Sequence, residues 1–335
     1  MGTDLKAAIL GVGSYVPEKK LTNSDFEKTL ETSDEWITSR TGIHSRRIAA
    51  ANQTTSDLCL LAAQGALKNA KIEATDLDLI LVATVTPDYP FPSSACLLQE
   101  KLGLGARGTP AFDLNAACSG FLYALSTAKA HIESGMAKNV LIVGAEVLSR
   151  ITDYKDRSTC ILFGDGAGAT VVGLHRPGSS SSHAIHSVRI WSDGRGATGL
   201  ILPGGGSAHP ASHGSVDDRL HYIRVNGREV FRFGVTKAVE MIQDVMERRG
   251  IKAQDIGRII PHQANIRIIE SASERLGLPM ELFFTNLTEY GNTSAASVPL
   301  ALDEALRNGL LPQGKPVILL AFGAGLTWAS AIVEW

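Results

Sequence analysis

Cys118, His262 and Asn292 are the residues of this 335-residue chain whose types best suit nucleophilic catalysis. Cys118 lies in AFDLNAACSGFLYAL, where alanine, serine and glycine neighbours leave space beside the sulfur at the start of an apolar run. The thiolate is the reactive form of cysteine, and a helix N-terminus stabilises it. Small neighbours also let a carbonyl approach both Sγ and the Cys118 N–H, a natural oxyanion donor. The stretch therefore suggests a nucleophile, although a lone cysteine at a helix start is more often a core residue.

The other two residues gain meaning only from their positions. His262 follows the apolar segment IGRIIP, at the carboxyl end of an expected strand, where open α/β sheets place ligands. Alone, it would more often be a buried histidine, and Asn292 a loop or cap residue. The remaining thiols have no comparable setting and are interpreted as structural, and no two cysteines form a C-x-x-C pair. They are Cys59, Cys96 and Cys160.

Apolar runs alternate with amphipathic segments along the whole chain, which predicts an α/β fold with a largely parallel sheet. Segments rich in serine, glycine and histidine predict loops at 175–187 and 203–215. Buried strands are expected at 77–85, 139–147, 256–261 and 316–323, and helices at 56–70, 233–250 and 265–277.

The same order of elements occurs twice, which predicts a duplication. A count of 17 residues back from the helix-ending Gly135 reaches Cys118, and the same count from Gly309 reaches Asn292. Pro299 is tolerated only if the second helix begins near Ala295. We therefore expect two halves, residues 1–174 with the cysteine and 175–335 with the histidine and asparagine, whose equivalent loops meet at one cavity.

Composition excludes several classes of protein. The net charge of −2, from 32 Lys and Arg against 34 Asp and Glu, argues against nucleic-acid binding. No apolar run approaches the roughly 20 residues of a membrane span. The N-terminal MGTDLKAAILGVGSYVPEKK lacks the layout of a signal peptide, so we expect a reducing, cytoplasmic setting without disulfides.

Six segments resemble one enzyme family. DLNAACSGFLYAL, PHQANIRII, YGNTSAASVPLAL, AFGAGLTW, TSDEWITSRTGI and FGDGAGA look like signature segments of 3-oxoacyl-[acyl-carrier-protein] synthase III, the thiolase-fold condensing enzyme that starts bacterial fatty-acid synthesis. The likeness runs from Gly11 to Trp335, and the order Cys, His, Asn separates this type from the elongating synthases. The resemblance implies a thiolase-like fold with layers arranged α-β-α-β-α.

The resemblance also implies a two-step condensation without metal, flavin or nicotinamide. Cys118 takes the acyl group from a short acyl-CoA, while the N–H groups of Cys118 and Ala324 hold the oxyanion. Malonyl-acyl-carrier protein then loses CO₂, and His262 and Asn292 donate hydrogen bonds to the enolate. Ala324 departs from the three consecutive glycines frequent in the family, which leaves the acyl preference open.

Binding residues follow from the same resemblance. A tryptophan matching Trp36 stacks on the CoA adenine, opposite an arginine matching Arg157, and Arg40 meets the CoA phosphates. Thr32 and Glu35, the first and last residues of TSDE before Trp36, form the pattern of a helix capping box. Arg232 and Arg267 match positions that attract the acidic carrier protein. Phe91 matches a residue that lines the acyl pocket across the interface of a homodimer.

Three other functions stay open. A papain-like thiol protease also has the order Cys, His, Asn, but its C-G-S-C-W type signature is absent. A non-catalytic subunit that binds an acyl carrier or CoA would not need all three residues. A related condensing enzyme that uses a specialised acyl-CoA in secondary metabolism is the nearest alternative. The glycines of GVGSYVP and GDGAGA do not form a dinucleotide fingerprint and are better explained by close backbone approach.

Overall fold

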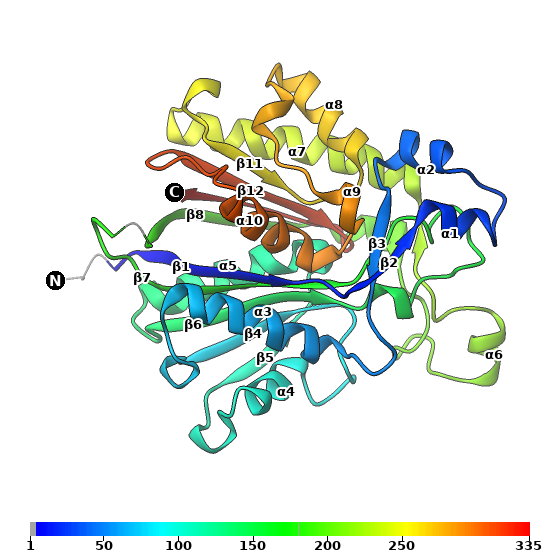
Figure 1. The fold of residues 1–335 in the computed structure, drawn as a ribbon, viewed down its shortest axis with the longest axis horizontal. Coiled ribbons are helices and arrows are strands. Elements are labelled where there is room, and N and C mark those ends of the chain that lie inside the picture. Colours follow the sequence, from blue (N-terminus) through cyan, green and yellow to red (C-terminus); the bar gives the residue numbers. More distant parts are fainter. Residues whose placement is uncertain (1–4, 180) are drawn as a thin grey trace.

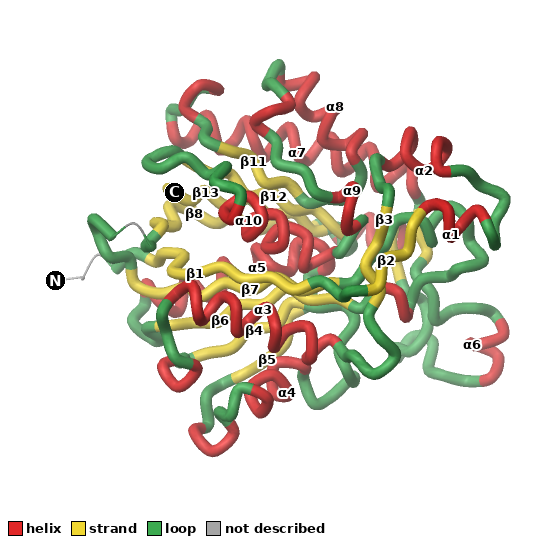
Figure 2. The backbone as a smooth tube through the Cα atoms, viewed as in Figure 1, coloured by secondary structure: helices red, strands yellow, loops and turns green. Residues whose placement is uncertain are grey.

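A nine-stranded sheet runs through the molecule in the order β11-β12-β13-β8-β1-β7-β6-β4-β5 (Figures 1 and 2). The computed structural model describes residues 5–179 and 181–335. The strands of this sheet are β1 (Ala7–Tyr15), β4 (Leu79–Ala83), β5 (Ala111–Leu114), β6 (Asn139–Glu146), β7 (Gly166–Leu174), β8 (His183–Ser192), β11 (Arg258–Pro261), β12 (Pro316–Gly323) and β13 (Thr327–Glu334).

Some helices cover the two outer faces of the sheet, and others lie between its two halves. The main ones are α3 (Thr55–Ala70), α4 (Ser94–Lys101), α5 (Gly120–Glu133), α7 (Gly227–Arg249), α8 (Ile266–Leu276) and α10 (Ser297–Arg307). The remaining elements are short helices and two pairs of strands. They are α1 (Asn23–Glu27), α2 (Asp34–Thr41), α6 (His213–Asp217), α9 (Leu287–Tyr290), and the pairs β2 (Lys19–Thr22) with β3 (Ser45–Ile48) and β9 (Leu200–Ile201) with β10 (Arg224–Val225).

Strand directions confirm a largely parallel sheet in each half. In the first, β1, β4, β5 and β6 run one way and only β7 opposes them, since β4 is parallel to β5 and β6 while β7 is antiparallel to β6 and β1. In the second, β13 alone opposes β8, β11 and β12.

The two halves repeat one topology, which confirms the duplication. The order β4-β6-β7-β1 in the first half matches β11-β12-β13-β8 in the second. The strand β5, which pairs with β4, has as its counterpart the isolated parallel bridge from Ile259 to Phe283. The first strands of the halves, β1 and β8, pair antiparallel through Ala8 and Ala184, as a twofold relation requires. The boundary between residues 174 and 175 stays a prediction, and residues 1–4 and 180 of the expected halves lie outside the described residues.

The layers follow the expected α-β-α-β-α order (Figure 1). Helices α3 and α4 cover the outer face of the first half, and α7 and α8 cover that of the second. Helices α5 and α10 lie between the two halves of the sheet, where they share the largest apolar core with strands from both. A buried middle layer of this kind fixes the residues at the N-terminal ends of α5 and α10 relative to each other.

The structure tests three local predictions, on a loop, on the glycines of GVGSYVP and on Pro299. The prediction of a loop over 175–187 is wrong in its second part, because β8 begins at His183. Many side chains of β8 are polar and half-exposed, which hides the alternation typical of a strand. The glycines of GVGSYVP do serve close approach, since a Cβ at Gly11 would lie 2.4 Å from Ala70 N and one at Gly13 would lie 2.3 Å from Ala66 N, both on α3. Helix α10 begins at Ser297, so Pro299 falls in its first turn as expected.

Candidate active site

Cys118 lies in the 3₁₀ turn Ala117–Ser119, directly before α5. The turn packs against β12 and against the 3₁₀ turn Ser294–Ala296. A Cβ at Gly323 would approach Cys118 N to 2.7 Å, so this position requires glycine. The fold thus holds the end of β12 against the backbone of the cysteine.

The equivalence of Cys118 and Asn292 that residue counting predicts is wrong by one helical turn. Helix α5 has 14 residues and α10 has 11, so equal counts from their ends do not reach equivalent positions. The structural counterpart of Asn292 is Asn115, because each accepts a hydrogen bond on Oδ1 from the N–H two residues later, at 2.9 Å from Ser294 and 3.3 Å from Ala117. Those two residues also share an unusual positive φ, 49° and 47°.

Burial changes the expected state of the nucleophile. The Cys118 side chain is almost fully enclosed, and desolvation raises its pKa from 9.0 to about 12, although the neighbouring Ser294 side chain opposes this shift. Burial therefore opposes the thiolate expected at the helix start and favours the thiol, whose proton must be removed during attack.

His262 follows β11 and is buried beside Phe322, with 5.4 Å between the ring centres. Its main-chain N–H donates to Leu320 O of β12 at 2.7 Å, which fixes the residue against the neighbouring strand. Burial lowers the pKa of the imidazole to about 3, so it is neutral at physiological pH. A neutral ring keeps one N–H and suits hydrogen-bond donation to an oxyanion.

The buried imidazole predicts a specific pH dependence of stability. Between pH 3 and 6.5 the unfolded chain binds a proton at His262 that the folded chain does not, so the free energy of unfolding falls as pH falls through this range. We expect the advantage of the wild type over His262→Gln to shrink by about 2 kcal/mol between pH 6.5 and 5. Urea titrations at several pH values measure it; a pH-independent difference would contradict this assignment.

Asn292 is fixed through both backbone and side chain. Its N–H donates to Leu162 O at 2.8 Å, and its carbonyl accepts from Gly164 N at 3.0 Å. Because the Ser294 N–H occupies Oδ1, the orientation of the amide is set and its NH₂ group is left to donate elsewhere. This is the arrangement that a hydrogen-bond donor to a developing enolate needs.

Ala324 stands in the turn between β12 and β13, and its φ is not positive. Its methyl group therefore fits the backbone without strain, and its N–H stays available. Thr327, which sequence reasoning missed, ties this turn to the nucleophile: its hydroxyl lies 3.0 Å from Ala324 O and 2.9 Å from Ala116 O. One buried side chain thus couples the two proposed oxyanion donors.

We expect Thr327→Val to loosen this coupling. The substitution keeps the shape but removes the one hydroxyl proton that the Ala116 and Ala324 carbonyls share. This loss should cost about 1–3 kcal/mol in the free energy of unfolding and slow acylation of Cys118 about tenfold. Urea titration and single-turnover acylation measure the two effects. Thr170→Val is the matched control, because the Thr170 hydroxyl is buried without a partner and its loss should not destabilise the protein.

A cavity of about 890 Å³ reaches Cys118. It brings Cys118, Ala324 and Ser294 together, with apolar walls that include Phe163 and Ile223. His262 and Asn292 do not line it; both are buried, and Asn292 is hydrogen-bonded to the lining residue Ser294. Phe91 does not line it either and is 86% exposed.

Trp36 lies on α2, close to both arginines predicted beside it. The ring centre is 4.7 Å from Arg40 Cζ and 4.9 Å from Arg157 Cζ, so an adenine could stack only after one guanidinium withdraws. The capping interpretation is corrected by one residue, since Ser33 caps α2 and accepts from Trp36 N at 3.1 Å.

Arg232 and Arg267 are exposed on α7 and α8, which pack together. Arg267 lies close to the tryptophan site, because the neighbouring Asn265 side chain donates to Arg40 O at 3.0 Å. Among the residues that the structure describes, none of the arginines at positions 40, 157, 232 and 267 pairs with a carboxylate. These four arginines therefore present charges that no described carboxylate pairs with, although the chain is slightly acidic.

Comparison with known proteins decides the family. Residues 112–194 match 3-oxoacyl-[acyl-carrier-protein (ACP)] synthase III, and residues 246–335 match its C-terminal part. A beta-ketoacyl-[acyl-carrier-protein] synthase III of Caldanaerobacter subterraneus subsp. tengcongensis is 52% identical over 99% of this chain and 98% of its own. The chain belongs to the 3-oxoacyl-[acyl-carrier-protein] synthase III family.

Solved structures agree with this membership in the synthase III family. The crystal structure of the Aquifex aeolicus enzyme has 45% identity and a TM-score of 0.88 over 98% of this chain and 100% of its own. A priming beta-ketosynthase from the R1128 polyketide pathway has 36% identity and a TM-score of 0.88, with 100% and 98% covered. Within the described parts of the chain, no helix has the length and apolar character to cross a membrane.

Proposed function

We propose that this protein condenses a short acyl-CoA with malonyl-acyl-carrier protein, loses CO₂ and forms a 3-oxoacyl-acyl-carrier protein, the first step of fatty-acid synthesis. It is an acyltransferase of the condensing class. The observation that carries the proposal is the cavity that reaches Cys118 beside the Ala324 turn. Burial keeps His262 neutral, and Asn292 is oriented by the cavity residue Ser294.

The first half-reaction is thioester exchange at Cys118. The sulfur attacks the acyl carbonyl, the N–H groups of Cys118 and Ala324 stabilise the oxyanion, and collapse releases the CoA thiol. Both donors lie on a backbone held by the contact of Gly323 with the nucleophile turn. No metal or organic cofactor takes part, because a thioester and a positioned thiol are sufficient for the exchange.

The second half-reaction forms the carbon–carbon bond. Malonyl-acyl-carrier protein loses CO₂, and the charge that develops on its thioester oxygen is stabilised by hydrogen bonds from His262 and Asn292. The resulting carbanion attacks acyl-Cys118, and the sulfur leaves as the 3-oxo product forms. The pKa of His262, lowered by burial to about 3, keeps the ring neutral, so it acts as a hydrogen-bond donor rather than as an imidazolium.

The direct test uses the intact mass of the protein after incubation with a panel of acyl-CoAs. We expect one acyl group on Cys118, and CO₂ release with a 3-oxo product once malonyl-acyl-carrier protein is added. Absence of acylation with every acyl-CoA would overturn the proposal and favour a non-catalytic binding subunit. Exclusive use of a specialised acyl group would favour the secondary-metabolism alternative, which the higher identity to fatty-acid synthases does not support.

The four exposed arginines without a carboxylate partner among the described residues support the assignment of the binding partners. Trp36, Arg40 and Arg157 would bind the nucleotide of CoA, and Arg232 and Arg267 would attract the acidic carrier protein. Long-range attraction of this kind raises the association rate and weakens with salt. All four cysteines are free thiols, as is usual for proteins of a reducing compartment, so we propose that the protein acts in the cytoplasm.

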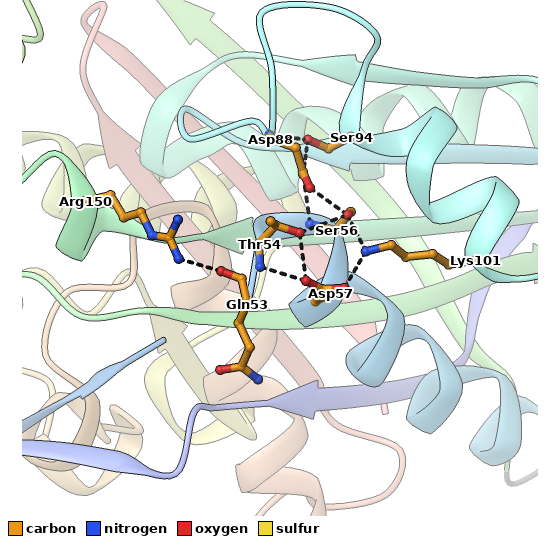
Figure 3. Close-up of polar contacts among 8 residues, drawn as sticks. All are labelled: Gln53, Thr54, Ser56, Asp57, Asp88, Ser94, Lys101 and Arg150. Carbon is orange, nitrogen blue, oxygen red and sulfur yellow. Dashed lines mark hydrogen bonds and ion pairs between the residues drawn. The ribbon is translucent and has the colours of Figure 1, made fainter. Parts of the chain in front are cut away.

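We also propose a homodimer, built on the sheet edge at β5. This strand ends the nine-stranded order and leaves its outer edge unpaired, with Phe112 42% exposed. The neighbouring segment presents Tyr89 and Phe91, which are 57% and 86% exposed. Figure 3 shows why this segment is fixed: Asp88 accepts hydrogen bonds from Ser56 and Ser94. Exposed aromatic side chains on a rigid base favour burial against a second copy.

We expect Phe91→Glu to dissociate the dimer. A charge at the centre of an apolar interface loses its hydration on association, so the dissociation constant should rise at least about 100-fold. Sedimentation or light scattering at several protein concentrations measures this change. Met136→Glu, at an apolar position that is 74% exposed, is the control and should leave the oligomeric state unchanged. A wild type that is monomeric at assay concentration would contradict the proposal.

A further inference from the structure

Glu146 is a fully buried carboxylate behind the nucleophile, and the condensation mechanism leaves it without a role. It ends β6, and its two oxygens accept four kinds of hydrogen bond: from Thr84 Oγ1 at 3.1 Å, Thr86 Oγ1 at 2.7 Å, Val85 N at 3.1 Å and Ser294 Oγ at 3.0 Å. Every donor is neutral, and no ion pair within the described residues includes Glu146. Burial of an acid without a cation is costly, so the position calls for a chemical reason.

Ser294 connects this carboxylate to the catalytic sulfur. Its hydroxyl donates to Glu146 Oε1, and its side chain lies beside the Cys118 thiol in the cavity that reaches the sulfur. Its N–H separately holds the Asn292 side chain. The backbone of Ser294 has φ of 49°, a region that a residue other than glycine seldom adopts. The fold therefore places this one hydroxyl between the thiol and the carboxylate.

We propose that Ser294 and Glu146 form a proton relay that removes the thiol proton of Cys118 during acyl transfer. The inference rests on the proposed role of Cys118 as the nucleophile. As the sulfur bonds to the acyl carbon, its proton passes to Ser294 Oγ, and the Ser294 proton passes to Glu146. When the bond between the acyl carbon and the CoA sulfur breaks, Glu146 returns a proton to Ser294 Oγ, and the Ser294 hydroxyl proton passes to the departing CoA thiolate. Ser294 contacts the reacting sulfur, and Glu146 acts through it as a positioning residue.

Protonation states on either side of the relay agree with this role. Burial raises the pKa of Glu146 to about 7, so near neutral pH the carboxylate can both accept and release a proton. The pKa of Cys118, raised to about 12, makes a base necessary, and His262, with its pKa lowered to about 3, is a poor one. The titratable groups that face Glu146 are Cys118 and, from α3, Cys59, whose pKa burial also raises. Neither thiol titrates near neutral pH.

The test is the pH profile of single-turnover acylation at saturating acetyl-CoA, followed by intact mass. In the wild type we expect the rate to rise through pH 7 and then level off. In Glu146→Gln the plateau should disappear, the rate should rise tenfold per pH unit to pH 9.5, and at pH 7.5 it should be about 100-fold slower. Glu146→Asp should restore the inflection. Ser294→Ala should behave like Glu146→Gln, and it should fold because Ala117 already occupies the same backbone conformation.

Asp165→Asn is the matched control for loss of a buried acid. Asp165 is equally buried and accepts from Ala49 N, Ser149 N and Ser149 Oγ, but it has no link to Cys118. We expect lower stability with the wild-type inflection retained. An unchanged inflection in Glu146→Gln and Ser294→Ala would overturn the relay. Absence of acylation in the wild type would instead overturn the proposed function, so the two failures are distinguishable.

Discussion

Cys118→Ala should abolish acyl-enzyme formation and lower the rate of condensation by about 10⁴-fold or more. No other thiol can take over, because Cys59 and Cys160 are buried outside the cavity and Cys96 is exposed on α4. The donors for the enolate are untouched by this change. We therefore expect the variant to retain slow decarboxylation of malonyl-acyl-carrier protein, which yields an acetyl product instead of a 3-oxo product.

Intact mass after incubation with acetyl-CoA measures the first effect, and CO₂ release measures the second. Cys96→Ala is the matched control and should acylate at the wild-type rate. An acyl adduct on Cys118→Ala, or condensation at the normal rate, would refute the assignment of the nucleophile. Loss of both decarboxylation and acylation would show that stabilisation of the enolate depends on the Cys118 sulfur. That result would contradict the assignment of the enolate donors to His262 and Asn292.

Local sequence patterns predicted the buried elements well. The continuous apolar run PVILLAFG became β12 with the same bounds, Pro316–Gly323, because a strand buried on both faces needs no polar alternation. The glycines of β1 were also interpreted correctly as sites of close approach, here by α3. The strand β8 was missed since its side chains are half exposed and polar, and its partners β1 and β13 lie far away in the sequence.

Relations between distant residues were harder to predict. The types and order of Cys118, His262 and Asn292 are visible in the chain, but the count that paired Cys118 with Asn292 failed because one helix is shorter. Thr327 and Ser294 look like ordinary strand and loop residues. Glu146 looks like the polar end of a strand. Their importance comes from packing between the two halves, which brings the end of β6 to the turn before α10.

The second large effect is expected at the enolate donors His262 and Asn292, and Asn115, the counterpart of Asn292, provides its comparison. His262→Ala and Asn292→Ala should each leave acylation within about tenfold of the wild type and slow decarboxylation and condensation about 10²–10³-fold. The reason is that these donors meet charge only on the malonyl thioester oxygen, after the acyl-enzyme has formed. Preformed acyl-enzyme mixed with malonyl-acyl-carrier protein isolates the second half-reaction, and CO₂ release follows it.

Asn115→Ala provides the matched comparison, because Asn115 holds the nucleophile turn through Ala117 N as Asn292 holds the opposite turn through Ser294 N. We expect the reverse division: slower acylation, by about tenfold, and a second half-reaction close to the wild type once the acyl-enzyme is formed. Equal losses in both half-reactions for His262→Ala or Asn292→Ala would contradict their assignment to the enolate. The duplicated halves would then share one oxyanion site, and the two symmetry-related asparagines would not have separate tasks.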